Sequence, residues 1–185
     1  MVFSAYQRTA LQSCTACILL VALLVFTQAN NVSGATMTNT TPNGQLCTTG
    51  QAAGFTGLVM ELCSASSYKL FQPIVLNITV TNIGTSFATL RFAYNVSITG
   101  TAWSASTLFF GLCAQLVCVF NPGDSISQTI TFITAPPGVF LFSRNPAPPG
   151  KYFVEASLLS CSIQGFLTVC DQPVATTSLR FNIVA

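Results

Sequence analysis

The sequence has little charge. Of its 185 residues only 5% are Asp, Glu, Lys or Arg, and the formal net charge is +2. So few cations provide no basic surface for nucleic acid, and we expect no nucleic-acid partner. A surface this poor in charge needs another solubilising group. N-glycosylation could supply it, because N-x-S/T triplets begin at Asn31, Asn39, Asn77 and Asn95, of which we take the last three as sites.

Histidine is absent, which removes the common nucleophilic arrangements of hydrolases. Without it, and with thiols expected to be oxidised, a zinc site is disfavoured as well. The four carboxylates, Glu61, Asp124, Glu155 and Asp171, are placed at turns, on a polar strand face or beside cysteines. We therefore expect no catalytic residues, no metal and no cofactor, and we read the protein as a non-enzyme.

Long hydrophobic runs are also scarce. The longest spans residues 16–26 and contains 11 apolar residues, fewer than the roughly 18 needed to span a bilayer comfortably. Weak positive charge precedes this run and small residues follow it, which predicts a secretory signal peptide over residues 1–29, cleaved after Ala29 or as late as Ala35. An uncleaved anchor is the less favoured alternative. The expected location is extracellular or the lumen of the endomembrane system.

Cysteine, by contrast, is plentiful, with eight residues in the chain. Cys14 and Cys17 lie at the edge of the signal segment and should leave with it. The others are Cys47, Cys63, Cys113, Cys118, Cys161 and Cys170. An even number in an oxidising compartment predicts three disulfides.

The remaining chain divides into two parts. Residues 30–45 are rich in Asn, Thr and Gly, and we expect a polar tether there. From residue 46 to 185, apolar residues alternate with polar ones in successive segments separated by Gly, Pro and Asn. With no helical period, this pattern predicts an all-β, immunoglobulin-like antiparallel β-sandwich of about seven strands, stapled by disulfides.

The alternation also predicts which side chains face inward. Segments 74–81, 90–98, 125–134, 150–159 and 178–184 are the clearest strands, and 58–62 is a weaker one. The expected inward residues are Ile74, Leu76, Ile78, Val80, Leu90, Phe92, Tyr94, Val96, Ile98, Ile126, Ile130, Phe132, Tyr152, Val154, Ala156, Leu158, Leu179, Phe181 and Ile183. Asn77 and Asn95 fall on the opposite, solvent-facing side of their strands.

One segment breaks the alternation. Residues 135–150, APPGVFLFSRNPAPPG, hold the four apolar residues 139–142 between two Pro-Pro-Gly triplets. Proline denies donors to a strand ladder, so this segment should be a loop. An apolar quartet on a loop suggests that it covers something.

Three motifs together resemble one known family. GLCAQLVCVFNPGD (111–124), APPGKYFVEASLL (147–159) and LTVC (167–170) occur in the order and spacing of the ML family, which are secreted lipid-recognition domains. The matching residues are Cys113, Cys118, Gly123, Pro148, Pro149, Gly150, Tyr152 and Cys170. The resemblance covers roughly residues 46–185.

The resemblance implies a lipid or sterol held between two sheets that part at one edge. The residues expected to contact it are Phe92, Tyr94, Val96, Trp103, Phe109, Phe110, Phe132, Phe140, Phe142, Tyr152 and Val154. Trp103, Phe109 and Phe110 are expected on a loop near the mouth. Val139, Phe140, Leu141 and Phe142 are expected to touch a membrane during lipid transfer.

The resemblance also implies disulfides Cys113–Cys118 and Cys47–Cys170, which leaves Cys63–Cys161. The residues alone do not choose between this set and the local pairs Cys47–Cys63 and Cys161–Cys170.

A different class of protein remains open. VTNIGTS (80–86) resembles the strand-ending turns of extracellular repeat modules, so the alternative is an immunoglobulin-like structural or adhesion module without a ligand cavity. A void of several hundred cubic ångströms between the sheets would favour lipid binding, since ligand pockets usually measure about 300 to 1,000 Å³. A closed core would favour the scaffold.

Overall fold

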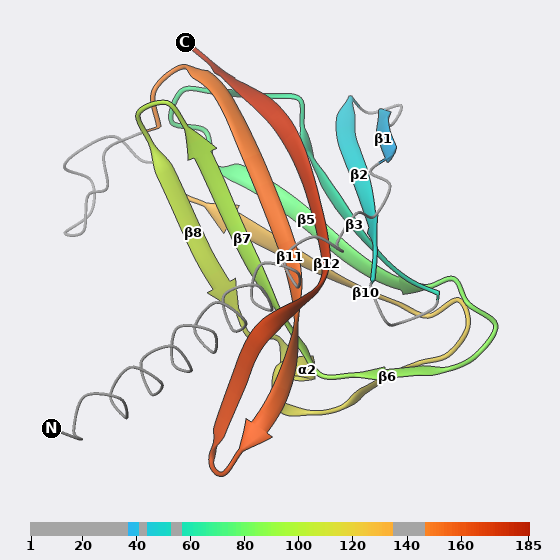
Figure 1. The fold of residues 1–185 in the computed structure, drawn as a ribbon. Helices are drawn as coiled ribbons and strands as arrows, with labels where there is room; N and C mark the ends of the chain where they lie inside the picture. Colours follow the sequence, from blue (N-terminus) through green and yellow to red (C-terminus); the bar gives the residue numbers. More distant parts are fainter. Residues whose placement is uncertain (1–36, 41–43, 53–56, 135–146) are drawn as a thin grey trace, which may run out of the picture. The chain divides into compact units, whose positions relative to one another are not determined.

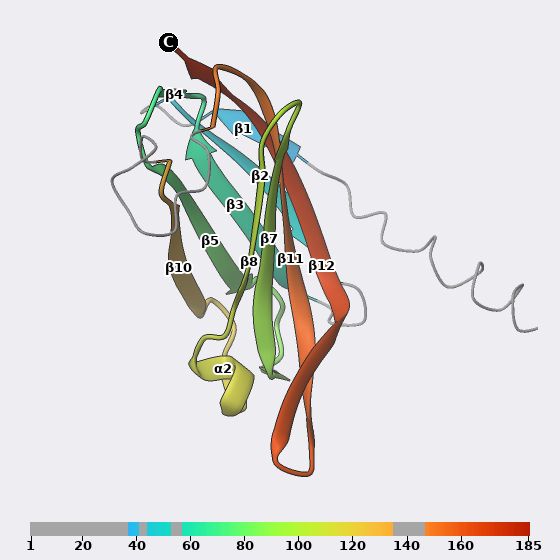
Figure 2. The same cartoon turned by 90° about the vertical axis from the view of Figure 1, so that its left-hand side faces the viewer.

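A computed structural model describes residues 37–40, 44–52, 57–134 and 147–185, all within the compact unit Gly34–Ala185. These residues form two five-stranded sheets and a small two-stranded one (Figures 1 and 2). Side chains from both large sheets share one apolar core. The expected all-β sandwich is confirmed.

The first sheet has the order β1 (Met37–Thr40), β2 (Gln45–Gln51), β3 (Leu58–Ala65), β5 (Ile74–Asn82) and β10 (Ser125–Phe132). The second has the order β4 (Ser67–Lys69), β12 (Leu167–Val184), β11 (Gly150–Gln164), β7 (Phe92–Gly100) and β8 (Ser104–Phe109). The third pairs β6 (Ala88–Leu90) with β9 (Cys118–Phe120). Neighbouring strands are antiparallel except β12 and β4, which are parallel. The short helix α2 (Leu112–Gln115) lies in the connection from β8 to β9.

The described residues contain more strands than the expected seven. The additional ones are short, as in β4, β6 and β9, or rich in small polar residues, as in β8 (SASTLF). Neither kind shows the run of large apolar residues by which alternation is recognised. Phe109 therefore lies on strand β8 and not on a loop as expected, whereas Phe110 follows the strand.

The predicted tether contains structure. Its residues 37–40 form β1, which pairs with β2 in the register Asn39 to Cys47. A strand at a sheet edge is held by backbone hydrogen bonds, which do not depend on apolar side chains. The sequon at Asn39 thus falls on a strand, and the signal segment 1–29 lies outside the described residues.

The inward faces follow the predicted alternation. In β5 the residues Ile74, Leu76, Ile78 and Val80 are fully buried. The same is true of the inward positions of β7, β11 and β12. β10 departs from this, since Ile126 is exposed at its start and Phe132 is only partly buried at its end; β10 is an edge strand with a neighbour on one side only.

The disulfides are Cys47–Cys63, Cys113–Cys118 and Cys161–Cys170. The pair Cys113–Cys118 is confirmed, but the pairing that the resemblance implied for the other four cysteines, Cys47–Cys170 and Cys63–Cys161, is wrong. The local alternative is the one observed. Its reason is strand register, because Cys47 lies directly opposite Cys63 across β2 and β3, and Cys161 opposite Cys170 across β11 and β12. Three disulfides are typical of an oxidising compartment.

Candidate ligand-binding cleft

The two large sheets meet closely along β2 and β12. A Cβ atom placed on Gly50 of β2 would lie 2.5 Å from the carbonyl oxygen of Thr176 in β12. The buried Thr177 hydroxyl donates a hydrogen bond of 2.9 Å to the Thr48 hydroxyl across the same junction. We call this side the closed edge.

The opposite side is built from the edge strands β8 and β10. Each is the last strand of its sheet. Between them lies a cleft of about 430 Å³, within the range usual for small-molecule sites. Its lining residues are Ser106, Thr107, Phe109, Thr129, Ile130, Thr131 and Phe132. We call this side the open edge.

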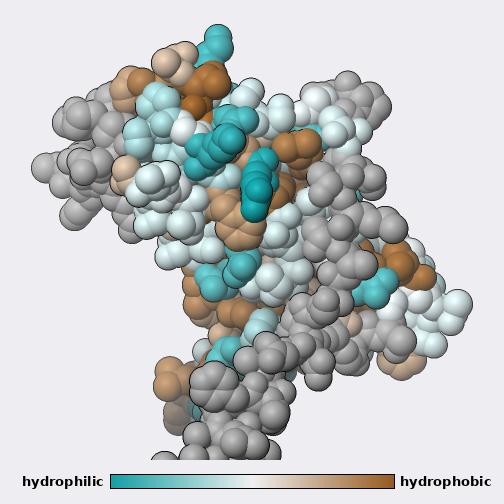
Figure 3. Space-filling view, turned by 45° about the horizontal axis from the view of Figure 1, so that its top comes forward, coloured by the Kyte–Doolittle hydropathy of each residue, from teal (hydrophilic) through white to brown (hydrophobic). Residues whose placement is uncertain are grey.

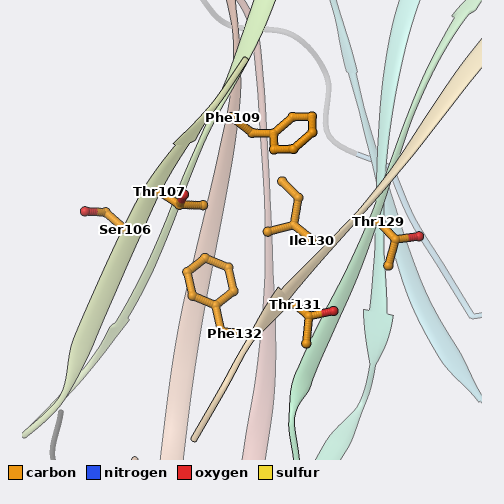
Figure 4. A pocket seen from close by; sticks show the side chains of 7 residues that line it. All are labelled: Ser106, Thr107, Phe109, Thr129, Ile130, Thr131 and Phe132. Atoms are coloured by element: carbon orange, nitrogen blue, oxygen red, sulfur yellow. The ribbon is translucent and has the colours of Figure 1, made fainter. Parts of the chain in front are cut away.

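Large apolar side chains line the interior of this cleft. Figure 4 shows the rings of Phe109 and Phe132 projecting into the space between the strands with Ile130 between them, while the hydroxyls of Thr129 and Thr131 point away. Ile130 is buried, and the two rings are partly buried against the core. None of the described residues that line the cleft is charged. Because the lining combines these three apolar side chains with Ser106, Thr107, Thr129 and Thr131, the site suits an uncharged group with apolar and polar parts.

The connection between β8 and β10 carries the first disulfide. It contains α2, β9 and the turn 121–124, and Cys113–Cys118 closes a short loop within it. Asp124 holds the turn by accepting hydrogen bonds from the Asn121 backbone amide at 2.7 Å and side-chain amide at 2.9 Å. The disulfide therefore restrains the segment that joins the two open-edge strands.

Several residues expected to bind lipid lie in the packed core instead. Phe92, Val96 and Val154 are at most 2% exposed and do not line the cleft. Phe92 packs on Phe120 with ring centroids 6.0 Å apart. Of the predicted contacts, the cleft contains Phe109 and Phe132. Phe140 and Phe142, with the expected membrane tip 139–142, lie outside the described residues.

Tyr152 of the Pro-Pro-Gly-x-Tyr motif packs within the sandwich. Its hydroxyl donates a 2.7 Å hydrogen bond to the carbonyl of Pro148, and burial raises its pKa. Its ring stacks on Phe181 at 5.5 Å and meets Trp103 edge to face at 5.9 Å. Gly100 leaves room for this ring, since a Cβ atom there would overlap it. This motif fixes the end of β11 and does not form the cleft.

Tyr94 lies between the core and the cleft. It is 2% exposed, and its ring centroid is 6.4 Å from that of Phe109, the residue directly opposite it in β8. Burial raises the pKa of its hydroxyl well above the usual range. That hydroxyl has no hydrogen-bond partner among the described residues.

Sequence reasoning missed the polar lining of the cleft. Ser106 and Thr107 lie on strand β8, which the alternation does not predict, and Thr129 and Thr131 alternate with the predicted inward residues Ile130 and Phe132. The cleft forms because both strands lie at the edges of their sheets. A single sequence does not show which strands are edge strands.

Other predicted sites are on the outer faces of the sheets. Asn95 is exposed on β7, and half-buried Asn77 accepts a 2.8 Å hydrogen bond from the Thr129 hydroxyl. Cys47, Glu61 and Cys63 lie together, but the two sulfurs are bonded to each other and are not free thiolate ligands.

Exposed apolar side chains occur at the end of the sandwich that carries α2 and the tip of the β11–β12 hairpin (Figure 2). They include Phe110, Leu116 and Val117 near α2 and Phe166 and Leu167 at the hairpin tip. On the face drawn in Figure 3, hydrophobic surface forms separate patches among hydrophilic side chains. Within the described part of the chain, no helix has the length and hydropathy required to cross a membrane.

Comparison with known proteins gives partial structural similarities. No protein-family model and no curated protein matches the sequence. A β-glucosidase from Listeria innocua in complex with laminaribiose is 9% identical with a TM-score of 0.42, over 69% of this chain and 16% of that one. Native α-2-macroglobulin from Escherichia coli, from domain MG7 to the C-terminus, is 12% identical with a TM-score of 0.39, over 72% and 17%.

A CARDB domain of the PF1109 protein from Pyrococcus furiosus, in complex with di-metal ions, is 13% identical with a TM-score of 0.40, over 72% of this chain and 92% of that domain. This chain spans less than a fifth of the β-glucosidase and macroglobulin chains. At these scores the similarities carry no argument about function. The class defined by the fold is a disulfide-stapled β-sandwich with one closed and one open edge.

Proposed function

We propose that the protein is a secreted lipid-binding or lipid-transfer protein that holds a lipid or sterol in the cleft at the open edge. The observation that carries this proposal is the cleft of about 430 Å³ between β8 and β10. It lies where two sheets of a sandwich part most easily, since an edge strand is bonded to its sheet on one side only. Secretion is supported by the three disulfides.

The driving force is burial of apolar surface. Each methylene group moved out of water contributes about 0.8 kcal/mol, before the cost of immobilising the ligand is subtracted. Phe109, Ile130 and Phe132 offer the apolar contact. The ligand lies along the edge in this proposal, because the rings of the central strands already pack against one another.

The second candidate is a structural or adhesion module without a ligand. The dense packing of the inner faces favours it, since Val96, Ile98, Val154 and Ala156 at the centre of the second sheet are completely buried by the protein itself. A sandwich closed in this way is stable without any bound molecule. Membrane contact through residues 139–142 and glycosylation of Asn39, Asn77 and Asn95 remain predictions under either function.

The experiment is extraction of lipid from protein purified after eukaryotic secretion, followed by mass spectrometry. We expect one apolar ligand molecule per wild-type protein. In Thr107→Trp the indole would fill the cleft, so the amount of extracted ligand should fall at least about tenfold. A tenfold loss of affinity corresponds to about 1.4 kcal/mol. The matched control is Thr99→Trp, which places the same ring on the exposed face of β7 and should retain ligand. Wild-type protein with no extractable lipid would support the structural module.

A further inference from the structure

The three described inward tyrosines differ in one respect. The hydroxyl of Tyr68 donates to the Val75 carbonyl at 2.7 Å, and that of Tyr152 donates to the Pro148 carbonyl at 2.7 Å. The hydroxyl of Tyr94 is buried and has no partner among the described residues. Buried polar groups in native proteins are nearly always hydrogen-bonded, so an unpaired hydroxyl calls for an explanation. A ligand group that bonds to it is one.

Tyr94 is placed to meet such a ligand. It lies opposite Phe109 in the β7–β8 register, with ring centroids 6.4 Å apart. Phe109 in turn lines the cleft, and Ile130 and Phe132 belong to the same apolar cluster as Tyr94. Phe109 thus packs near Tyr94 on one side and lines the ligand space on the other. A ligand in the cleft would reach the Tyr94 hydroxyl if the Phe109 ring, at the end of an edge strand, turned aside.

The charge of the site limits the ligand group. No charged side chain is found among the described residues that line the cleft. A carboxylate or phosphate placed beside Tyr94 would be buried without a counter-charge, which is strongly unfavourable. A hydroxyl or carbonyl oxygen needs no counter-charge and accepts a hydrogen bond from a neutral phenol.

We propose that the cleft selects an apolar molecule with one uncharged oxygen group, a hydroxyl or a carbonyl, which accepts a hydrogen bond from the Tyr94 hydroxyl. This inference rests on the proposed function, and it adds the chemical class of the ligand and the residue that selects it. Burial raises the pKa of Tyr94, so its hydroxyl stays protonated and able to donate over the physiological pH range.

The test is a titration of delipidated protein with naphthalene, 2-naphthol and 2-naphthoate, followed by probe fluorescence. We expect the wild type to bind 2-naphthol about tenfold more tightly than naphthalene, the effect of one hydrogen bond worth about 1.4 kcal/mol. The 2-naphthoate anion should bind most weakly. In Tyr94→Phe the preference of 2-naphthol over naphthalene should disappear, while naphthalene binds as before.

Thermal stability of the ligand-free protein provides a second readout. Tyr94→Phe should leave Tm unchanged or raise it, because it removes an unpaired buried hydroxyl. The control Tyr68→Phe removes a paired hydroxyl outside the cleft, so it should lower Tm by about 3 °C and keep the probe preference.

Each outcome is decisive. If naphthalene and 2-naphthol bind equally to the wild type, or if Tyr94→Phe lowers Tm as much as Tyr68→Phe, the inference is wrong while the cleft keeps its proposed function. If lipid is extracted but no probe binds, the inference fails alone. If no lipid is extracted and no probe binds, both proposals fall.

Discussion

Along β2 and β12 the two sheets approach until a side chain on Gly50 would touch the opposite backbone, whereas along β8 and β10 they leave a cleft of about 430 Å³. The difference lies in the residues between them. The closed edge has Gly50 and a hydrogen-bonded pair of threonines, Thr48 and Thr177. The open edge has Phe109 and Phe132. In one sandwich, small residues let the sheets close and aromatic residues hold them apart.

The largest expected effect concerns the disulfides. Cys47–Cys63 joins β2 to β3 near the closed edge with a sequence separation of 16, and Cys113–Cys118 lies between the open-edge strands with a separation of 5. Replacing the first pair by alanine should lower the unfolding free energy by about 3 kcal/mol, and replacing the second pair should lower it by about 2 kcal/mol. The first effect is larger because the longer loop gains more conformational entropy in the unfolded chain when its disulfide is removed. Urea denaturation measures both.

Ligand retention should show the reverse order. Loss of Cys113–Cys118 frees the segment that joins β8 to β10, so lipid should be released faster from that variant than from the Cys47/Cys63 variant. Equal release from the two would contradict a special role for the open edge.

Glycine-to-alanine changes sharpen the comparison. Gly50→Ala should destabilise the protein by about 2 kcal/mol, because its methyl group meets the Thr176 carbonyl and forces the sheets apart. Gly111→Ala, beside the cleft, places its methyl group 3.6 Å from the Phe109 ring, an ordinary contact, and should change stability by less than about 0.5 kcal/mol. Similar losses in the two variants would argue against a tight closed edge.

The smallest expected effect concerns the threonine pair. Thr177→Val should cost about 1 kcal/mol, since it leaves the buried Thr48 hydroxyl without this partner. The double change Thr48→Val with Thr177→Val should recover most of that loss, because both polar groups are then replaced by apolar ones. A double variant as unstable as the sum of the single changes would show that the hydrogen bond is not what couples the sheets.

Residue patterns predicted the sandwich because a strand with one buried face must alternate, as Ile74, Leu76, Ile78 and Val80 do. They did not predict β8, whose small polar residues carry no such pattern, nor which strands lie at the edges, since that depends on pairing between distant segments. The cleft depends on both.

The disulfide pairing also depends on strand register, although one of the pairs could have been predicted from the sequence. Cys161 and Cys170 are symmetric about the turn at Gly165 and Phe166, so a hairpin over 161–170 would have placed them opposite each other. The spacing of Cys47 and Cys63 has no such marker, because a longer connection joins β2 to β3. Only strand register decides that pair.

The central claim is that the open edge holds the ligand. A fatty alcohol bearing a photoreactive diazirine, irradiated with the delipidated protein and mapped by peptide mass spectrometry, tests it most directly. We expect adducts within β8 and β10, at residues 104–109 and 125–132, and their loss in Thr107→Trp but not in Thr99→Trp. Adducts confined to the exposed β11–β12 tip at residues 163–167, or equal labelling of the two variants, would contradict the claim.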